Sequence, residues 1–216
     1  MTTTRMRVPF AYLTEEFDPE KPLAQAILRD IKAELSRCYF TLGPQVERFE
    51  AAWAEMCGVR YAIGVNSGTD ALFLALKALA VGPANTITTT PNSFVATVGA
   101  ALATGAKVEL VDIGPDYQAN VPVGRSLDVF IPVHLTGDVA APETGRARVV
   151  VEDACQAVGA TYNGVTVGGL GDAGAFSLHP LKNINVWGDA GVVTTNYGDV
   201  ASRVRLLRNH GLIDRD

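Results

Sequence analysis

The sequence contains few cysteines, and their spacing excludes two common uses of this residue. There are three among 216 residues, Cys38, Cys57 and Cys155, and no two of them form a CxxC pair. An odd, widely spaced set is neither a disulfide framework nor a zinc site, so we expect no metal. Reduced thiols are typical of a cytoplasmic protein. Cys155 lies close to an aspartate, but it is more typical of a small core residue than of a nucleophile.

The sequence also lacks an excess of positive charge and any long hydrophobic run. Lys and Arg number 18 against 23 Asp and Glu, so the net charge is −5. That balance leaves no electrostatic footprint for nucleic acid. The start, Met1-Thr-Thr-Thr-Arg-Met-Arg-Val8, has no apolar core of secretory length. Apolar runs are interrupted by Gly, Thr or Lys before they reach a membrane-spanning length. We therefore expect a cytoplasmic protein with no nucleic-acid partner and no membrane association.

The remaining composition is that of a globular protein built from alternating strands and helices. Hydrophobic residues make up 48% and charged residues 19%, and the length suits one large domain or two small ones. Apolar residues at helical spacing predict helices over 22–37, 45–56, 69–79, 94–104 and 200–209. Short β-branched runs predict strands over 61–65, 86–90, 107–111, 129–133, 149–152, 173–177 and 191–195. Several strands are apolar on both faces, which favours an α/β fold with a parallel sheet covered on both sides.

Two connections between predicted strands are poor in helix-forming residues. Residues 114–124 and 136–147 are rich in proline and glycine, so we expect no helix in either. Parallel crossovers usually carry a helix that covers the sheet. We therefore expect apolar sheet surface to be exposed here, at a cost of about 25 cal/mol per Å². Exposed surface of this kind is typical of an interface or of aggregation.

Lys182 and Asp153 have the spacing of a pyridoxal 5'-phosphate (PLP) site. A strand-like run ends at Asp153, and about thirty residues later a second apolar run is followed by Lys182. In such sites the lysine forms a Schiff base with the cofactor aldehyde, and the aspartate pairs with the pyridinium nitrogen. The spacing alone fits a solvated surface lysine as well.

The segment Val65-Asn-Ser-Gly-Thr-Asp-Ala71 is a candidate phosphate cradle. It follows a predicted strand and opens an apolar helix, whose N-terminus is a natural anion site. Gly68 permits a close backbone approach, and Thr69 offers a hydroxyl and an amide. The segment has neither GK[ST] nor GxGxxG, which makes ATP and dinucleotides poor candidates. A plain helix cap at Ser67 or Thr69 is the alternative.

Other polar and aromatic residues follow predicted strands. Phe94 can stack on an aromatic cofactor ring, although a core phenylalanine is the more common explanation. Gln156 lies near the end of a strand and can donate a hydrogen bond, and Ser177 can reach a phosphate oxygen. The histidines His134 and His179 can each lie near a site, but lone histidines are more often structural.

In this chain order, the motifs resemble those of the sugar aminotransferases of the DegT/DnrJ family, which are fold-type-I PLP enzymes. The matching stretches are Tyr39-Phe-Thr-Leu-Gly-Pro44, Ala62-Ile-Gly-Val-Asn-Ser-Gly-Thr-Asp-Ala-Leu72, Pro132-Val-His-Leu135, Glu152-Asp-Ala-Cys-Gln-Ala157, Phe176–Gly188 and Leu207-Arg-Asn-His-Gly211. The resemblance implies an α/β fold with a three-layer, mostly parallel sheet, that of an aspartate aminotransferase-like PLP-dependent transferase large domain. Residues 1–216 would form this domain, with a helical segment over about 1–57. The chain is shorter than the family, and a C-terminal small domain would be absent.

The resemblance also implies a role for each site residue. Lys182 would form the Schiff base and then move a proton between Cα of the amino donor and C4′ of the cofactor. Asp153 would keep the pyridine nitrogen protonated, Gln156 would contact the ring hydroxyl oxygen, and Phe94 would stack on the ring. The cofactor phosphate would be held by Gly68, Thr69 and Ser177.

The function implied is transfer of an amino group, usually from glutamate, to a keto group of a nucleotide-linked deoxysugar, by a homodimer. A related branch dehydrates such sugars and carries histidine in place of Lys182, so the lysine favours transamination. Two alternatives stay open. A non-catalytic relative acting as a binding or dimerising module is favoured by the missing small domain. A lysine-based enzyme without PLP is disfavoured by the phosphate cradle and Asp153.

Overall fold

The structure is a computed structural model that describes residues 11–38 and 40–213. The start of the chain, Met1 to Val8, and Tyr39 of the first matching stretch lie outside the described residues. The chain forms two compact units, Met1–Gln45 and Val46–Asp216. All the predicted site residues belong to the second unit.

The described part of the first unit contains the helices α1 (Leu13–Glu16) and α2 (Pro22–Leu35). The short helix α1 was not predicted. The helix α2 begins where the sequence indicates, because Lys21 is extended and the fixed φ of Pro22 suits the first helical turn. Of its residues only Ala24 is buried. Four of its large apolar side chains are exposed, namely Leu23, Leu28, Ile31 and Leu35.

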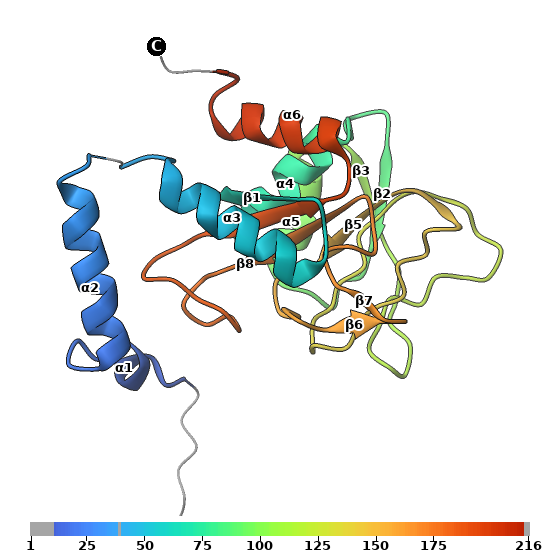
Figure 1. Cartoon of the computed structure of the whole chain (residues 1–216). Coiled ribbons are helices and arrows are strands. Elements are labelled where there is room, and N and C mark those ends of the chain that lie inside the picture. The colour runs from blue at the N-terminus through green and yellow to red at the C-terminus, as the bar shows by residue number, and fades with distance from the viewer. Residues whose placement is uncertain (1–10, 39, 214–216) are drawn as a thin grey trace, which may run out of the picture. The chain divides into compact units, whose positions relative to one another are not determined.

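The helices of the second unit are α3 (Pro44–Cys57, whose first two residues belong to the first unit), α4 (Gly68–Ala78), α5 (Val95–Ala103) and α6 (Gly198–Arg208). Its strands are β1 (Tyr61–Val65), β2 (Thr86–Thr89), β3 (Lys107–Leu110), β4 (Leu127–Phe130), β5 (Ala147–Asp153), β6 (Thr161–Tyr162), β7 (Val165–Thr166), β8 (Ala173–Ser177) and β9 (Gly191–Thr195). Strands and helices alternate as predicted from α3 to β3, and the strands β4 to β9 then follow without a helix before α6 (Figure 1). Among residues 11–38 and 40–213, no helix has the length and apolar character needed to span a bilayer.

Seven of the strands form one sheet, in the order β1-β9-β8-β5-β4-β2-β3. The pairs from β8 through β5, β4 and β2 to β3 are all parallel. β9 is antiparallel to both of its neighbours, β8 and β1, so β1 runs in the same direction as β8. The mostly parallel sheet expected from the sequence is confirmed.

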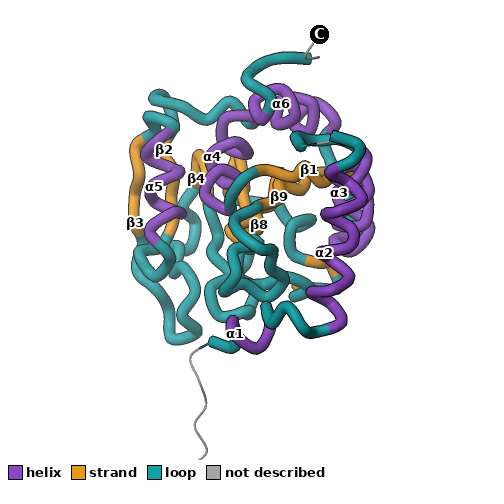
Figure 2. The backbone as a smooth tube through the Cα atoms, turned by 90° about the vertical axis from the view of Figure 1, so that its left-hand side faces the viewer, coloured by secondary structure: helices purple, strands orange, loops and turns teal. Residues whose placement is uncertain are grey.

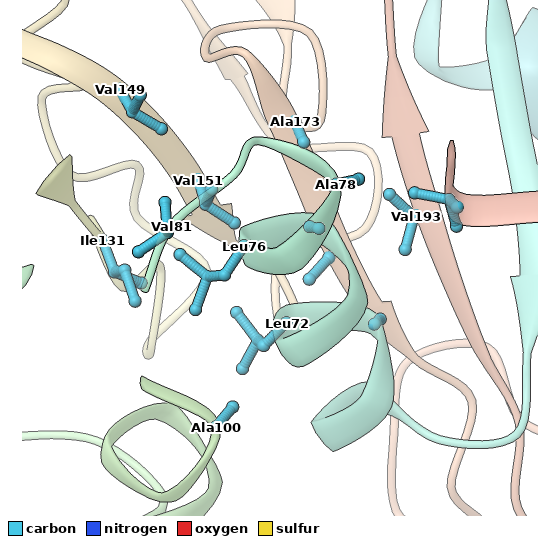
Figure 3. Close-up of a cluster of buried hydrophobic side chains, with 14 of the residues drawn as sticks. Leu72, Leu76, Ala78, Val81, Ala100, Ile131, Val149, Val151, Ala173 and Val193 are labelled. Carbon is cyan, nitrogen blue, oxygen red and sulfur yellow. The ribbon is translucent and has the colours of Figure 1, made fainter. Parts of the chain in front are cut away.

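One face of the sheet is covered by α4, α5 and α6. Leu72 and Leu76 of α4 are fully buried, in one cluster with Ile131, Val151 and Val193 of the strand region (Figure 3). The helix carries apolar residues on nearly all sides because it lies between the sheet and two other helices. Its predicted burial is therefore confirmed.

The opposite face packs against α3. Trp53 lies between two phenylalanine rings, 5.5 Å from the centroid of Phe49 and 5.4 Å from that of Phe176. Adjacent strand residues reach the two faces alternately, so Ala175 joins the α4 cluster and Phe176 the α3 cluster. In the turned view of Figure 2, α3 lies beside β1 and α5 beside β3, at opposite edges of the sheet.

The two helix-poor connections contain no helix, as predicted. The expectation that they would leave apolar sheet exposed is wrong for β4. Leu127 is only 6% exposed and Phe130 only 1%, and both lie in a cluster with Val111 and Val121. Val121 comes from the connection between β3 and β4 itself. A loop can cover a strand without forming a helix when a single apolar side chain turns inward.

A short hairpin, β6–β7, was not predicted, although the sequence carries its signal. The two strands are joined by Asn163 and Gly164, with φ of 49° and 81°. Positive φ at both central residues is the requirement of the tightest hairpin turn, and Asn-Gly satisfies it best. The strands of two residues each are too short to stand out by alternation.

Candidate active site

The predicted site residues gather at one edge of the sheet. The parallel strands β5 and β8 end at Asp153 and Ser177, and β1 runs in the same direction and leads into Gly68. Phe94 follows β2, and Lys182 follows β8. In open α/β sheets, ligands bind beyond the carboxyl ends of the parallel strands, where the loops converge.

Asp153 is held from both sides of its carboxylate. One oxygen, Oδ2, accepts a hydrogen bond of 2.6 Å from Oγ1 of Thr97, and Oδ1 accepts one of 3.3 Å from the backbone N–H of Cys155. Its own N–H donates to the carbonyl of Pro132 at 2.9 Å, and its carbonyl accepts from the N–H of His134 at 3.0 Å. With only 7% of its surface exposed, the side chain has a defined orientation.

His134 and Glu152, both fully buried, lie beside Asp153 in the fold. Nδ1 of His134 accepts the N–H of Ala140 at 3.1 Å, so a neutral ring carries its proton on Nε2 and donates it to Glu152, 3.3 Å away. The Glu152 carboxylate also accepts three backbone N–H groups from residues 168–171. The pair ties two loops to β5, so His134 is a structural residue, as expected.

Lys182 is half-buried and lies against the turn that follows β5. Its Nζ donates a hydrogen bond of 3.3 Å to Oε1 of Gln156 and lies 6.0 Å from the centroid of the Phe94 ring. Nε2 of Gln156 donates to the carbonyl of Leu135 at 2.9 Å, which fixes the amide. The lysine amine is therefore directed across the site, toward the residues that follow Asp153. His179 shapes its turn by accepting the N–H of Lys182 at 2.8 Å on its carbonyl.

The N-terminus of α4 lies directly against Ser177. A Cβ placed on Gly68 would come within 2.6 Å of the Cβ of Ser177, which is closer than two such atoms approach. Ser67 is the N-cap of α4, because its Oγ accepts the N–H of Asp70 at 3.1 Å. Of the two cap residues considered, Ser67 and Thr69, the structure therefore has Ser67. The cap leaves the N–H groups of Gly68 and Thr69, which have no partner within the helix. An anion next to Ser177 would face these two donors.

Phe94 is not a core residue. Its side chain is 66% exposed, and it stands at the N-cap of α5. The common explanation considered for this residue therefore does not apply. An exposed aromatic ring near the amine of Lys182 leaves a flat apolar surface at the edge of the site.

The pKa of the Cys155 thiol is affected by both the Asp153 carboxylate and the Lys182 amine. Burial and then the charge of Asp153 raise the pKa of the Cys155 thiol well above its usual value, while the Lys182 ammonium lowers it. The thiol therefore stays protonated at neutral pH and is inert as a nucleophile, in agreement with its expected packing role.

Within the described residues, no group of three His, Cys, Asp or Glu side chains is arranged to hold a metal ion.

Two residues next to Asp153, Thr97 and Ser93, were not predicted from the sequence. Thr97 is fully buried and bonded to Asp153, and its Oγ1 lies 2.5 Å from Oγ of Ser93. The signal was present, since Thr97 is the one hydroxyl in the apolar stretch 95–103. A buried hydroxyl nearly always has a hydrogen-bond partner.

The structure is thus an α/β protein whose mostly parallel sheet carries a lysine, a buried carboxylate and a helix N-terminus at its carboxyl edge. The sequence matches the DegT/DnrJ/EryC1/StrS aminotransferase family over residues 22–216. The chain belongs to this family.

Two named relatives are nucleotide-sugar aminotransferases. The chain is 37% identical over 97% of its length to UDP-N-acetyl-3-dehydro-alpha-D-glucosamine 3-aminotransferase of Acidithiobacillus ferrooxidans, and it covers 59% of that protein. It is 36% identical over 95% of its length to dTDP-3-amino-3,4,6-trideoxy-alpha-D-glucose transaminase of Streptomyces venezuelae, and it covers 56% of that protein. The chain thus spans less than two thirds of the length of these relatives.

Solved structures share the fold. DesV of S. venezuelae, in complex with a ketimine intermediate, superposes with a TM-score of 0.85 at 34% identity, over 97% of this chain and 59% of DesV. NtdA of Bacillus subtilis, with the bound cofactor PMP, superposes with a TM-score of 0.80 at 29% identity, over 95% of this chain and 49% of NtdA. The expected transferase fold is confirmed.

Proposed function

We propose that this chain binds PLP and acts in a nucleotide-sugar aminotransferase. The observation that carries the proposal is the position of Lys182, whose Nζ donates a hydrogen bond to Gln156, three residues after the strand end at Asp153. The amine and the carboxylate come from segments that are far apart in the chain, and the fold brings them to one edge of the sheet.

The residues present fit the three chemical parts of PLP. The start of α4, with Ser177 against it, supplies donors suited to a phosphate. The buried carboxylate of Asp153 suits a protonated ring nitrogen, and the Lys182 amine suits an aldehyde. The exposed ring of Phe94 suits stacking on a flat heterocycle. No further cofactor is required by this donor set.

When bound, PLP supplies an electron sink that stabilises negative charge on the α-carbon of an amino acid. Lys182 Nζ would hold the cofactor through its aldehyde carbon, with loss of water, and as a free amine it would move a proton between Cα of the amino donor and C4′ of the cofactor. Asp153 would hold the proton on the ring nitrogen. A carboxylate only accepts hydrogen bonds, so it favours the form of the nitrogen that carries a proton to donate. Gln156 would orient the lysine amine through its Oε1 and contact the ring hydroxyl. Thr69 would add a hydroxyl and an N–H to the phosphate site.

We propose glutamate as the amino donor and a keto group of a nucleotide-linked deoxysugar as the acceptor. The acceptor class is supported by the UDP-sugar and dTDP-sugar enzymes named above. We also propose that the protein works in the cytoplasm as a homodimer, with residues 1–216 forming one PLP-binding domain. The exposed apolar residues of α2 support self-association, and the free cysteines support a reducing compartment.

The function is tested by a visible absorption scan of the purified protein after PLP is added and the excess removed. We expect a retained band from lysine-bound cofactor, because Lys182 would supply the amine, Asp153 the carboxylate and the start of α4 the phosphate donors. Addition of glutamate should bleach the band, since the amino group then passes to the cofactor.

Each result of this scan has a distinct meaning. A retained band that glutamate does not change would contradict glutamate as the donor but keep the cofactor. The absence of any retained band would overturn the proposed function and favour a non-catalytic relative that serves as a binding or dimerising module.

Gly68→Ala tests the phosphate cradle. A methyl group there would have to push the start of α4 away from Ser177, because it would otherwise lie 2.6 Å from that residue's Cβ. Overpacking of this kind costs about 1–3 kcal/mol, so we expect the Kd for PLP to rise by about tenfold or more. The melting temperature should fall by roughly 2–10 °C. Fluorescence titration with PLP and thermal unfolding measure the two effects.

Gly99→Ala is the matched control. Gly99 lies within α5, and a Cβ at that position meets no atom within 4 Å. Alanine favours a helix interior over glycine by up to about 1 kcal/mol, so this variant should bind PLP as the wild type does and be at least as stable. Equal PLP affinity in the two variants would show that close packing of α4 on Ser177 is not needed for binding.

A further inference from the structure

Thr97 makes the shortest hydrogen bond to Asp153, and the mechanism above does not use it. Its Oγ1 lies 2.6 Å from Oδ2 of Asp153, and both residues are buried, with 0% and 7% of their surfaces exposed. A hydrogen bond to a charged partner in such surroundings is stronger than a neutral one. The residue belongs to α5, 56 positions before the aspartate in the chain.

The direction of the hydrogen bonds follows from proton counting. An ionised carboxylate only accepts, and a threonine hydroxyl has one proton, so Thr97 donates that proton to Asp153. The 2.5 Å contact between Ser93 and Thr97 then has Ser93 as the donor. Ser93, Thr97 and Asp153 thus form a chain in which every proton points toward the carboxylate.

The hydrogen bonds from Ser93 to Thr97 and from Thr97 to Asp153 hold one oxygen of the carboxylate. Without the Thr97 hydroxyl, the side chain of Asp153 would keep the 3.3 Å contact from the N–H of Cys155 and a hydrogen bond with the Cys155 thiol. The hydrogen bond from the N–H of Cys155 is long, and it reaches Oδ1 rather than the Oδ2 that Thr97 contacts. Thr97 therefore makes the shortest of the hydrogen bonds to this carboxylate, at Oδ2. The same helix start carries Phe94, since the N–H of Thr97 donates to the Phe94 carbonyl at 3.1 Å. A single turn of α5 therefore supports both the candidate stacking ring and the aspartate.

We infer that Thr97, backed by Ser93, is a positioning residue that orients the Asp153 carboxylate toward the cofactor's ring nitrogen. The inference rests on the proposed function and extends it to a residue that touches neither cofactor nor substrate. Its consequence is electronic, because a misaligned carboxylate holds the ring proton less well and weakens the electron sink. A purely structural hydroxyl would affect stability and leave the ring nitrogen unchanged.

The test compares Thr97→Val with Thr97→Ser in protein loaded with PLP that carries ¹⁵N in the ring. Valine keeps the shape of threonine without the hydroxyl, whereas serine keeps the hydroxyl. The ¹⁵N chemical shift of the ring nitrogen, followed with pH, reports whether that nitrogen is protonated. We expect Thr97→Val to lose the ring proton at lower pH than the wild type and to turn over about tenfold more slowly. Thr97→Ser should restore both properties.

Thr104→Val is the matched control. Thr104 lies at the other end of α5, is buried, and donates its hydroxyl to the carbonyl of Ala101 at 2.7 Å, away from Asp153. Its loss should lower stability without moving the ring nitrogen signal. Ser93→Ala provides a second test at a half-buried position outside the helix, and it should shift the signal in the same direction by a smaller amount.

The outcomes separate the two proposals. If wild-type protein retains no PLP, the proposed function fails, and the role of Thr97 fails with it. If wild-type protein retains PLP but Thr97→Val gives the wild-type ring signal and turnover, the positioning role alone is overturned. Equal shifts in the Thr97 and Thr104 variants would also overturn it, because both would then reflect a general loosening of α5. If Thr97→Val does not fold, a wild-type ring signal in Ser93→Ala overturns it.

Discussion

Lys182→Ala is expected to lose the visible band of lysine-bound cofactor and to reduce transamination by about 10⁴-fold. The amine is the group that would both attach the cofactor and move the proton, and a positioned acid–base group alone contributes 10²–10⁴-fold. The half-buried side chain donates one hydrogen bond, to Gln156, so its removal should leave the fold intact. Absorption after desalting and a coupled glutamate assay measure the two effects.

Lys77→Ala serves as the control for this variant. Lys77 is an exposed lysine of α4, on the same helix that begins at the phosphate cradle but far along it. Its loss should change neither the band nor the turnover. A Lys182→Ala protein that kept the wild-type band would show that another lysine bonds the cofactor, and the assignment of Lys182 would be abandoned.

Asp153→Asn is expected to keep the lysine-bound cofactor but to lower transamination by roughly 10²-fold or more. A neutral amide no longer favours a protonated ring nitrogen, so the ring accepts electrons less well. Removing one partner of a buried, hydrogen-bonded charge pair costs about 2–5 kcal/mol, which corresponds to this loss of rate. The hydroxyl of Thr97 can still donate to the amide oxygen, so the local packing should survive.

Single-turnover kinetics, followed through the absorption band, give the decisive readout for this variant. Asp199→Asn, at an exposed position in the first turn of α6, controls for the loss of one negative charge. Unchanged turnover in Asp153→Asn would remove the ring-nitrogen role from Asp153, whatever the result for Lys182.

Much of the fold could be predicted from local sequence. The strands at 61–65, 173–177 and 191–195 have the predicted bounds, because each is a short apolar or β-branched run with clear flanking residues. The helices agree to within a few residues, and α2 begins at the expected proline. Local propensity missed α1 and the β6–β7 hairpin, which carry too little periodicity, and it placed at 129–133 the strand that the structure has at Leu127–Phe130.

Part of the site could be predicted in the same way. Gly68, Asp153, Ser177 and Lys182 stand at strand ends or just after them, and strand ends on a parallel sheet share one edge. The exposure of Phe94 could not be predicted, because an aromatic residue between a strand and a helix suits either the core or the surface. The burial of β4 by Val121 could not be predicted either, since it depends on how a loop without regular structure folds back.

The sequence by itself determined the alternation of strands and helices, the identities of the candidate site residues and membership of the aminotransferase family. These depend on short-range propensity and on motifs a few residues long. Only the tertiary structure decided that β9 runs antiparallel between β1 and β8, that Gly68 touches Ser177, and that Thr97 bonds Asp153. The reason is physical: such contacts join residues tens of positions apart, so they depend on the order and register of the strands. Register is set by burial of the whole sheet, which no local segment of the sequence specifies.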